Sequence, residues 1–281
     1  MYRLKSMAAV ALACGVLLSV GGRAETAEKQ VAQYVRFQVA DTVAYGIVEG
    51  DRVRRLDGDL FGQWKPTGTT HQLSDVKLLV PAQPSKVLAA AHNYRSHGGD
   101  TAPPEVPQFF YKPPSCLIAQ AEPIVIPEGA TNVQYEAELV IVIGRRARNV
   151  PEARALDYVL GVTCGNDVSA RDWQKNDTQW WRAKGSDTFG PCGPRIVAGL
   201  DYDDLLVQLR QNGEVKQQER TSQMIFNVSQ MVSFASRHCT LEAGDLIFTG
   251  TSGQTTNIAP GDVIEVEVEG VGVLKNPVAV P

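Results

Sequence analysis

The segment YEAELVIVIG, residues 135–144, contains the strongest structural signal in the chain. Glu136 and Glu138 lie two residues apart, so both side chains project from the same face of a strand. Leu139 to Ile143 follow without a polar position, which is typical of a strand that other elements cover on both faces. The segment therefore predicts a pair of carboxylates at the mouth of a buried strand.

A third acid is predicted to join this pair. The apolar stretch Val159–Val162 leads into NDVSARD, residues 166–172, which places Asp167 at another strand end. Like charges at a buried site repel each other and lose hydration, at a cost of several kcal/mol unless a cation neutralises them. Three carboxylates without a nearby His or Cys favour a hard ion, Mg²⁺, Mn²⁺ or Ca²⁺, over Zn²⁺. Salt bridges with Arg145, Arg146 or Arg171 would explain the acids almost as well.

Strand signals surround this segment, so we predict a β-rich α+β fold. Short strands are expected at FFY (109–111) and PIVIP (123–127), and 207–218 reads as a hairpin whose Asn-Gly pair suits a type I′ turn. Val263 to Gly270 alternates apolar residues with three glutamates, interpreted as the solvated face of a strand. Two helices are expected, one from near Pro151 toward Leu160, the other carrying Ile225, Val228, Val232 and Ala235 on one face.

The first third of the chain is predicted to be organised separately from the rest. Residues 34–56 alternate apolar and polar positions, a pattern typical of a short antiparallel meander. Gly62 to Thr70 is expected to be a linker, and the strand Lys86–Ala91 opens the main body. We therefore divide the chain into residues 1–24, an N-terminal β appendage with its linker at 25–80, and a main domain at 81–281.

Residues 1–24 are predicted to be a secretory signal peptide. Arg3 and Lys5 precede the apolar run Met7–Val20, and small residues follow at Gly22 and Ala24. The run is shorter than the roughly 20 residues that cross a bilayer, so no membrane association is expected after cleavage. We predict export to the periplasm, or a cytoplasmic location if the true start codon lies downstream.

Composition excludes several other classes of protein. The 281 residues are 43% hydrophobic and 21% charged, which is ordinary for a folded protein and excludes disorder. The net charge of −4, without a Lys/Arg tract, argues against a nucleic-acid partner. Four cysteines remain after cleavage, without a CxxC pair, and we assign no disulfide and no zinc site to Cys116, Cys164, Cys192 or Cys239.

The run from Lys86 to Pro277 resembles the fumarylacetoacetate hydrolase (FAH) family. The resemblance rests on the motifs NYRSH (93–97), FFYKPPS (109–115), YEAELVIVIG (135–144), NDVSARDWQ (166–174), AKGSDTFGPCGP (183–194), FTGT (248–251) and APGDVIEVEVEGVG (259–272). It implies a mixed β-sandwich roll, usually a homodimer, with Mg²⁺ or Mn²⁺ held by Glu136, Glu138 and Asp167.

The resemblance also implies roles for residues outside the acidic trio. The family lid motif YxxHxxE is matched by Tyr94 and His97, but its acid is replaced by the shorter Asp100. His97 and Asp100 would form the catalytic dyad, with Tyr94 near the substrate. Four further residues match family positions: Lys184 would donate to a developing oxyanion, and Arg171, Gln174 and Thr251 would contact substrate. Ser252 stands where family members often have proline, so the part of the site wall that selects the substrate is expected to differ.

The function that these residues imply is hydrolysis of the C–C bond of an acylpyruvate or similar diketo acid, through an enolate that the ion stabilises. Decarboxylation of an oxo-dicarboxylate and isomerisation of a 2-hydroxy-dienoate are the alternatives within the family. An exported protein that binds a metal or ligand without catalysis is the alternative from another class.

Overall fold

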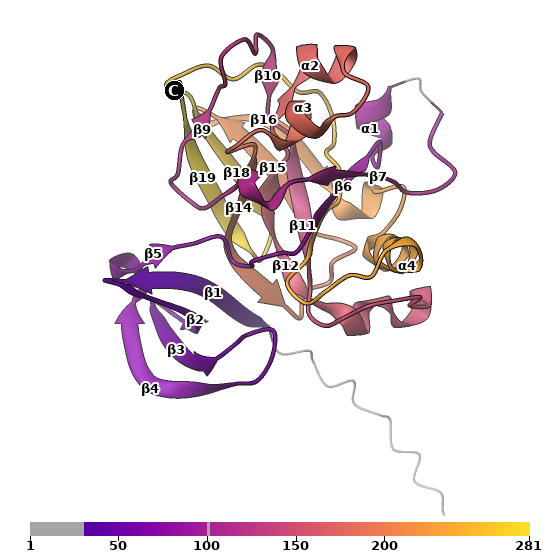
Figure 1. Ribbon diagram of the computed structural model, residues 1–281. Coiled ribbons are helices and arrows are strands. Elements are labelled where there is room, and N and C mark those ends of the chain that lie inside the picture. Colours follow the sequence, from indigo (N-terminus) through magenta and orange to yellow (C-terminus); the bar gives the residue numbers. More distant parts are fainter. Residues whose placement is uncertain (1–30, 100–101) are drawn as a thin grey trace, which may run out of the picture.

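The computed structural model describes residues 31–99 and 102–281 (Figure 1). The predicted signal peptide and Asp100 lie outside the described residues. Among the described residues, no helix combines the length and the apolar character that crossing a bilayer requires.

Within these ranges, strands dominate and form two large sheets. The larger sheet contains β1 (Ala32–Val39), β2 (Thr42–Glu49), β3 (Arg52–Gly58), β4 (Trp64–Gln72), β5 (Lys77–Leu78), β6 (Val87–Ala91), β7 (Gln108–Lys112), β8 (Leu117–Ile118), β11 (Ala137–Ile143), β12 (Val159–Asn166), β14 (Gly190–Ala198) and β17 (Leu246–Phe248). Its main path runs β4-β3-β2-β1-β14-β12-β11-β17-β6-β7, with β5 beside β1 and β8 beside β14. Because β6 is parallel to β17 and most other pairs are antiparallel, the sheet is mixed.

The second sheet packs against the middle of the first. It contains β9 (Ile124–Val125), β15 (Leu206–Gln211), β16 (Glu214–Arg220), β18 (Val263–Val268) and β19 (Gly272–Ala279), in the order β16-β15-β18-β19-β9. A separate pair joins β10 (Val133–Gln134) to β13 (Ser169–Ala170). The predicted β-rich α+β class is confirmed.

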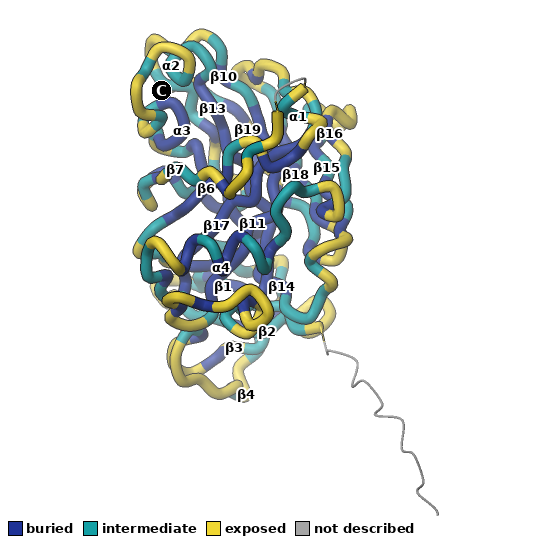
Figure 2. The backbone as a smooth tube through the Cα atoms, turned by 90° about the vertical axis from the view of Figure 1, so that its right-hand side faces the viewer, coloured by how far each residue is buried: buried dark blue, intermediate teal, exposed yellow. Residues whose placement is uncertain are grey.

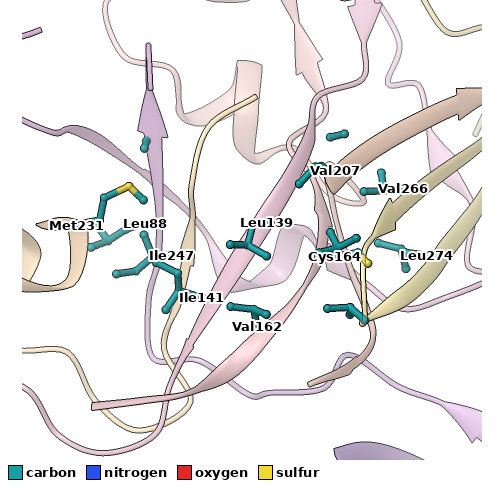
Figure 3. Packing of buried hydrophobic residues seen from close by; sticks show 14 of the residues in the cluster. Leu88, Leu139, Ile141, Val162, Cys164, Val207, Met231, Ile247, Val266 and Leu274 are labelled. Atoms are coloured by element: carbon teal, nitrogen blue, oxygen red, sulfur yellow. The ribbon is translucent and has the colours of Figure 1, made fainter. Parts of the chain in front are cut away.

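Strand β11 is buried on both faces, as its uninterrupted apolar sequence predicts. Leu139 and Ile141 pack with Val266 and Leu274 of the second sheet in the core shown in Figure 3. The opposite face, with Val140 and Val142, belongs to a second cluster that includes Leu56 and Leu60 of the N-terminal region.

The helices are short. They are α1 (Arg95–Gly98), α2 (Arg171–Asn176), α3 (Trp181–Gly185) and α4 (Val228–His238). The amphipathic helix predicted from Ile225 to Ala235 is confirmed as α4, although it starts at Val228, where Asn227 and Gln230 form a capping box. The predicted helix at 151–160 is wrong in type, because Glu152–Tyr158 forms a 3₁₀ helix that ends directly at β12.

The N-terminal meander is confirmed as β1 to β4, with two differences from the prediction. Residues 64–72 form β4 instead of a linker, since the Thr-rich segment pairs with β3 at the sheet edge, where Pro66 is tolerated. In addition, β1 pairs with β14, so the meander continues the large sheet of the main body. Figure 2 shows β4 largely exposed at the outer end of the molecule.

Two local predictions concern the second sheet. The hairpin turn is confirmed, because Asn212 and Gly213 adopt φ values of 55° and 82° between β15 and β16. The glutamate face of β18 is only partly solvated, since Arg210 of β15 contacts Glu265 at 3.1 Å and Glu267 at 2.7 Å.

Candidate metal centre

Three carboxylates meet where β11 and β12 lie side by side. The strands are antiparallel with Ala137 opposite Asn166, so Glu136 just before β11 and Glu138 near its start face Asp167 just after β12. The backbone N–H of Asp167 donates to the carbonyl of Glu136 at 2.9 Å, which fixes this register. All three side chains are buried, and one oxygen from each lies within 4.8 Å of the others. The predicted convergence of Glu136, Glu138 and Asp167 is therefore present in the structure.

Cationic side chains contact two of the three carboxylates. Lys184 Nζ lies 2.6 Å from Glu136 Oε2 and 2.8 Å from Asp167 Oδ2, and Arg171 Nη2 lies 2.5 Å from Glu136 Oε1. Burial raises the pKa of Glu136, but Lys184, Arg171 and His97 outweigh it and hold that pKa at about 2. The salt-bridge interpretation thus applies to Arg171 and Glu136.

Arg145 and Arg146, the other candidates for that interpretation, lie outside the site. They face Asp157 at 3.9 Å and Glu242 at 3.7 Å.

Glu138 is the carboxylate that these cations leave without a salt bridge. Its Oε2 accepts a hydrogen bond from the backbone N–H of Gly250 at 2.7 Å, whereas Oε1 is buried without a hydrogen-bond partner. Burial and the charges of Asp167 and Glu136 raise the pKa of Glu138 well above its ordinary value. An oxygen-only donor set with one buried, unsatisfied oxygen fits a hard divalent cation, and the trio could hold one.

Lys112 is a functional residue that sequence reasoning missed, although it lies inside the quoted motif FFYKPPS. The residue is 1% exposed, and its ammonium group donates to Asp167 Oδ1 at 2.6 Å, to the carbonyl of Phe189 at 3.0 Å and to the carbonyl of Lys184. Burial lowers the pKa of Lys112, but Asp167, Cys116 and Glu138 together more than compensate, and the pKa is raised overall. All three N–H groups are therefore used, and Lys112 fixes Asp167 from the side that Lys184 leaves free.

His97 on α1 faces the trio with its ring held by a backbone carbonyl. His97 Nδ1 lies 2.8 Å from the carbonyl oxygen of Gly253, so this nitrogen carries the proton, and Nε2 lies 3.8 Å from Glu136 Oε1. The backbone N–H of Gly253 in turn donates to Ser96 Oγ at 3.1 Å. Gly253 thus provides the orientation that the sequence assigns to Asp100, a residue outside the described ranges, and the predicted dyad stays a prediction.

A small cavity of about 40 Å³ connects the predicted residues. Arg171 Nη1 donates to Gln174 Oε1 at 2.8 Å, so these two side chains act as one unit at its wall. His92 also lines this cavity. The predicted site residues among its lining are His97, Glu136, Arg171, Gln174, Lys184 and Thr251.

Two residues predicted to contact substrate are engaged by the protein itself. The Thr251 hydroxyl donates to the carbonyl of Ala137 at 2.9 Å and accepts from Gln217 Nε2 at 3.0 Å. Tyr94 is buried, and burial together with Glu138 raises its pKa. Thr251 lines the cavity, whereas Tyr94 is not among its lining residues, and contact of either side chain with substrate stays a prediction.

Comparison with known families identifies the fold. Residues 86–279 match the family described as Fumarylacetoacetate (FAA) hydrolase C-terminal, and residues 33–81 match the Rv2993c-like N-terminal family. The chain belongs to the fumarylacetoacetate hydrolase family, whose members are enzymes that include isomerases, decarboxylases and hydrolases.

Three similar proteins illustrate the range of the family. Protein Rv2993c of Mycobacterium tuberculosis is 43% identical over 86% of this chain and 96% of its own length. A crystal structure titled 5-carboxymethyl-2-hydroxymuconate delta-isomerase, from Mycobacterium smegmatis, superposes with a TM-score of 0.85 at 42% identity and covers 89% of this chain and 100% of that one. Maleylpyruvate hydrolase from Sphingobium, in complex with manganese and pyruvate, reaches a TM-score of 0.73 at 27% identity over 88% of this chain and 99% of that one.

Proposed function

We propose that this protein is a divalent-metal-dependent enzyme that hydrolyses the C–C bond of an acylpyruvate or similar diketo acid. The observation that carries the proposal is the buried trio in which Glu138 Oε1 has no hydrogen-bond partner, close to a histidine whose Nε2 lies 3.8 Å from Glu136 Oε1. The manganese and pyruvate bound by the Sphingobium hydrolase support a 2-oxo acid and favour Mg²⁺ or Mn²⁺ over Ca²⁺.

The bound ion would supply positive charge that polarises the oxygens of a 2-oxo acid. Arg171 and Lys184 present N–H groups to the same cavity, where they can bind the carboxylate and stabilise negative charge on oxygen. Both groups are already fixed by Glu136, so little reorganisation is required.

His97 is placed to move the proton in this reaction. Nε2 takes a proton from water, and the hydroxide formed adds to the distal ketone of the substrate. The bond between that carbon and the methylene then breaks, releasing a carboxylic acid and the enolate of pyruvate. The imidazolium returns its proton to the enolate carbon, so the enzyme ends as it began.

Keto–enol isomerisation of a 2-oxo acid is the second candidate, and the Mycobacterium smegmatis isomerase favours it. His97 would move one proton between substrate atoms without consuming water, which needs only a single base. Decarboxylation would share the same cavity and release CO₂.

The metal requirement is tested by chelation followed by addition of Mn²⁺ across a panel of diketo and oxo acids. We expect turnover to be lost and restored, with ¹⁸O from water appearing in the carboxylic acid product. Deuterium exchange without ¹⁸O incorporation would identify an isomerase. Activity indifferent to chelation would contradict both candidates.

Catalysis itself is tested by His97→Ala, with His71→Ala on the distant meander as the control. We expect His97→Ala to lower kcat at least about 100-fold, the lower range for losing a general base. If neither the unmodified protein nor the variant exceeds the uncatalysed rate across the substrate panel, the result would favour the binding protein without catalysis. N-terminal sequencing of the native protein tests the predicted export, and its mass in solution tests the predicted homodimer.

A further inference from the structure

The cavity that holds the candidate catalytic groups is too small for a whole substrate. Its volume of about 40 Å³ holds only a few water-sized groups, since one water needs about 10–15 Å³ by this measure. A second cavity of about 240 Å³ adjoins it and shares three lining residues with it, Ala91, Phe110 and Trp180. A substrate whose reacting end occupies the first cavity can therefore extend its tail into the second.

The shared wall is aromatic. The Phe110 and Trp180 rings meet edge to face, with centroids 5.4 Å apart and planes at 71°. Both residues are half-buried, and Lys184 Nζ lies 5.3 Å from the centroid of the Phe110 ring. The aromatic pair thus stands at the boundary between the charged reaction site and the second cavity.

The remaining lining of the second cavity is uncharged. Its other residues are Gln108, Phe109, Thr178 and Gln179, so no described lining residue carries a charge. Arg182, which lies nearby in sequence, is held by Asp177 through bonds of 2.6 and 2.7 Å. A carboxylate desolvated in this cavity would lack a cationic partner, whereas an apolar tail gains from burial against the rings.

A charged alternative exists elsewhere on the lid but is not connected to the reaction site. The cavity of about 520 Å³ lined by Arg95, Glu219 and Ser222 shares no lining residue with the catalytic cavity. A distal carboxylate could meet Arg95 there only by a path separate from the aromatic wall.

We propose that the second cavity is the tail subsite of the 2-oxo acid and that it selects an uncharged tail over one that ends in a carboxylate. This inference rests on the proposed function, because it assumes that the 2-oxo acid end lies in the first cavity. Trp180 and Phe110 are its specificity-determining residues. The uncharged Gln179 occupies a position at which a cation would be needed to bind a carboxylate tail.

Binding measurements on the full-length, Mn²⁺-loaded protein test the subsite without depending on the reaction type. Pyruvate, 2-oxohexanoate and 2-oxoadipate share the 2-oxo acid end, and the last two differ only in a terminal methyl or carboxylate. We expect calorimetry to show 2-oxohexanoate binding about tenfold more tightly than 2-oxoadipate, a preference within reach of a hydrophobic pocket. Trp180→Ala should lower the ratio of 2-oxohexanoate affinity to pyruvate affinity about tenfold.

Gln179→Lys supplies the opposite test, because it adds the missing cation. We expect it to raise the affinity for 2-oxoadipate at least fivefold, whereas the matched control Arg95→Gln should leave the preference unchanged. If the unmodified protein binds pyruvate tightly but prefers 2-oxoadipate to 2-oxohexanoate, the result overturns the subsite proposal and leaves the proposed function standing. Failure of pyruvate itself to bind overturns the proposed function and the subsite together.

Discussion

Lys112 shows how a single buried cation can position a candidate metal ligand, since its ammonium group holds Asp167 Oδ1 at 2.6 Å. Lys112→Met would leave Asp167 Oδ1 buried without its cation, and losing one partner of a buried pair costs about 3–5 kcal/mol. We expect urea denaturation to show this loss in free energy of unfolding, and calorimetry to show at least tenfold weaker Mn²⁺ binding. Exposed Lys65, 3.6 Å from Asp57, is the control, and Lys65→Met should change stability by less than about 0.5 kcal/mol. Unchanged Mn²⁺ affinity in Lys112→Met would contradict a positioning role.

In the absence of metal, Glu138 lowers the stability of the folded protein by an amount that depends on pH. Because its folded-state pKa is raised above 4.5, the folded protein holds this proton more tightly than the unfolded chain does. Stability is therefore lost as pH rises from about 4.5 through the folded-state pKa, and the penalty is complete above that pKa. Glu138→Gln keeps the acceptor for Gly250, so it should raise the metal-free melting temperature at neutral pH and have little effect below pH 4.5.

The same variant should remove the stabilisation that Mn²⁺ confers on the unmodified protein, because ligand-linked stability requires binding to the folded state. Glu214→Gln, on an exposed strand position, serves as the control. A Glu138→Gln protein that Mn²⁺ still stabilises fully would contradict the metal assignment.

The sequence could predict those site residues whose positions follow from a local sequence pattern. Glu136, Glu138 and Asp167 stand at the ends of apolar strands, so periodicity alone places them together. Lys112 and the carbonyl of Gly253 reach the site from segments whose packing no local pattern records. Their roles follow only from tertiary contacts.

At the scale of elements, β12 must pass very close to its neighbours to deliver Asp167. A Cβ on Gly165 would lie 2.3 Å from Val140 Cγ2 and 2.6 Å from Phe248 Cε1 in the packed core. We expect Gly165→Ala to cost about 1–3 kcal/mol, the usual range for overpacking, measured by calorimetric melting. Gly68 of β4 has no atom within 4 Å of such a Cβ, so Gly68→Ala is the matched control. Equal melting temperatures for the two variants would contradict the close packing.

The sequence predicted the type of an element correctly where burial imposes a hydrophobic periodicity. The prediction failed where the element is mostly exposed and no such periodicity exists. The apolar faces of β11 and α4 are required by the core, and both elements were predicted. Strand β4 is mostly exposed, so its polar sequence looks like a linker although backbone pairing with β3 makes it a strand. The 3₁₀ helix at 152–158 is likewise mostly exposed and differs from an α-helix only in hydrogen bonding.

For the whole molecule, the N-terminal meander and the main body should unfold together. Ala32 to Tyr34 pair with β14, and Leu56 and Leu60 pack with Phe248. We expect one calorimetric transition for the full chain. A chain that starts at residue 81 would expose the β14 edge and this apolar surface, so it should melt at lower temperature and aggregate. A separate transition for residues 31–80 would contradict this coupling.

The free thiols determine how the whole molecule responds to the redox conditions around it. Cys116, Cys164 and Cys192 are unpaired and buried, and burial raises the pKa of each thiol, that of Cys164 to about 12. Thiols held neutral and away from solvent react slowly with oxidants. Sheet pairing and core packing hold these segments in place without disulfide bonds. The redox potential of the surrounding glutathione therefore has little effect on the native state. The same fold can persist on either side of a membrane that separates reducing from oxidising conditions.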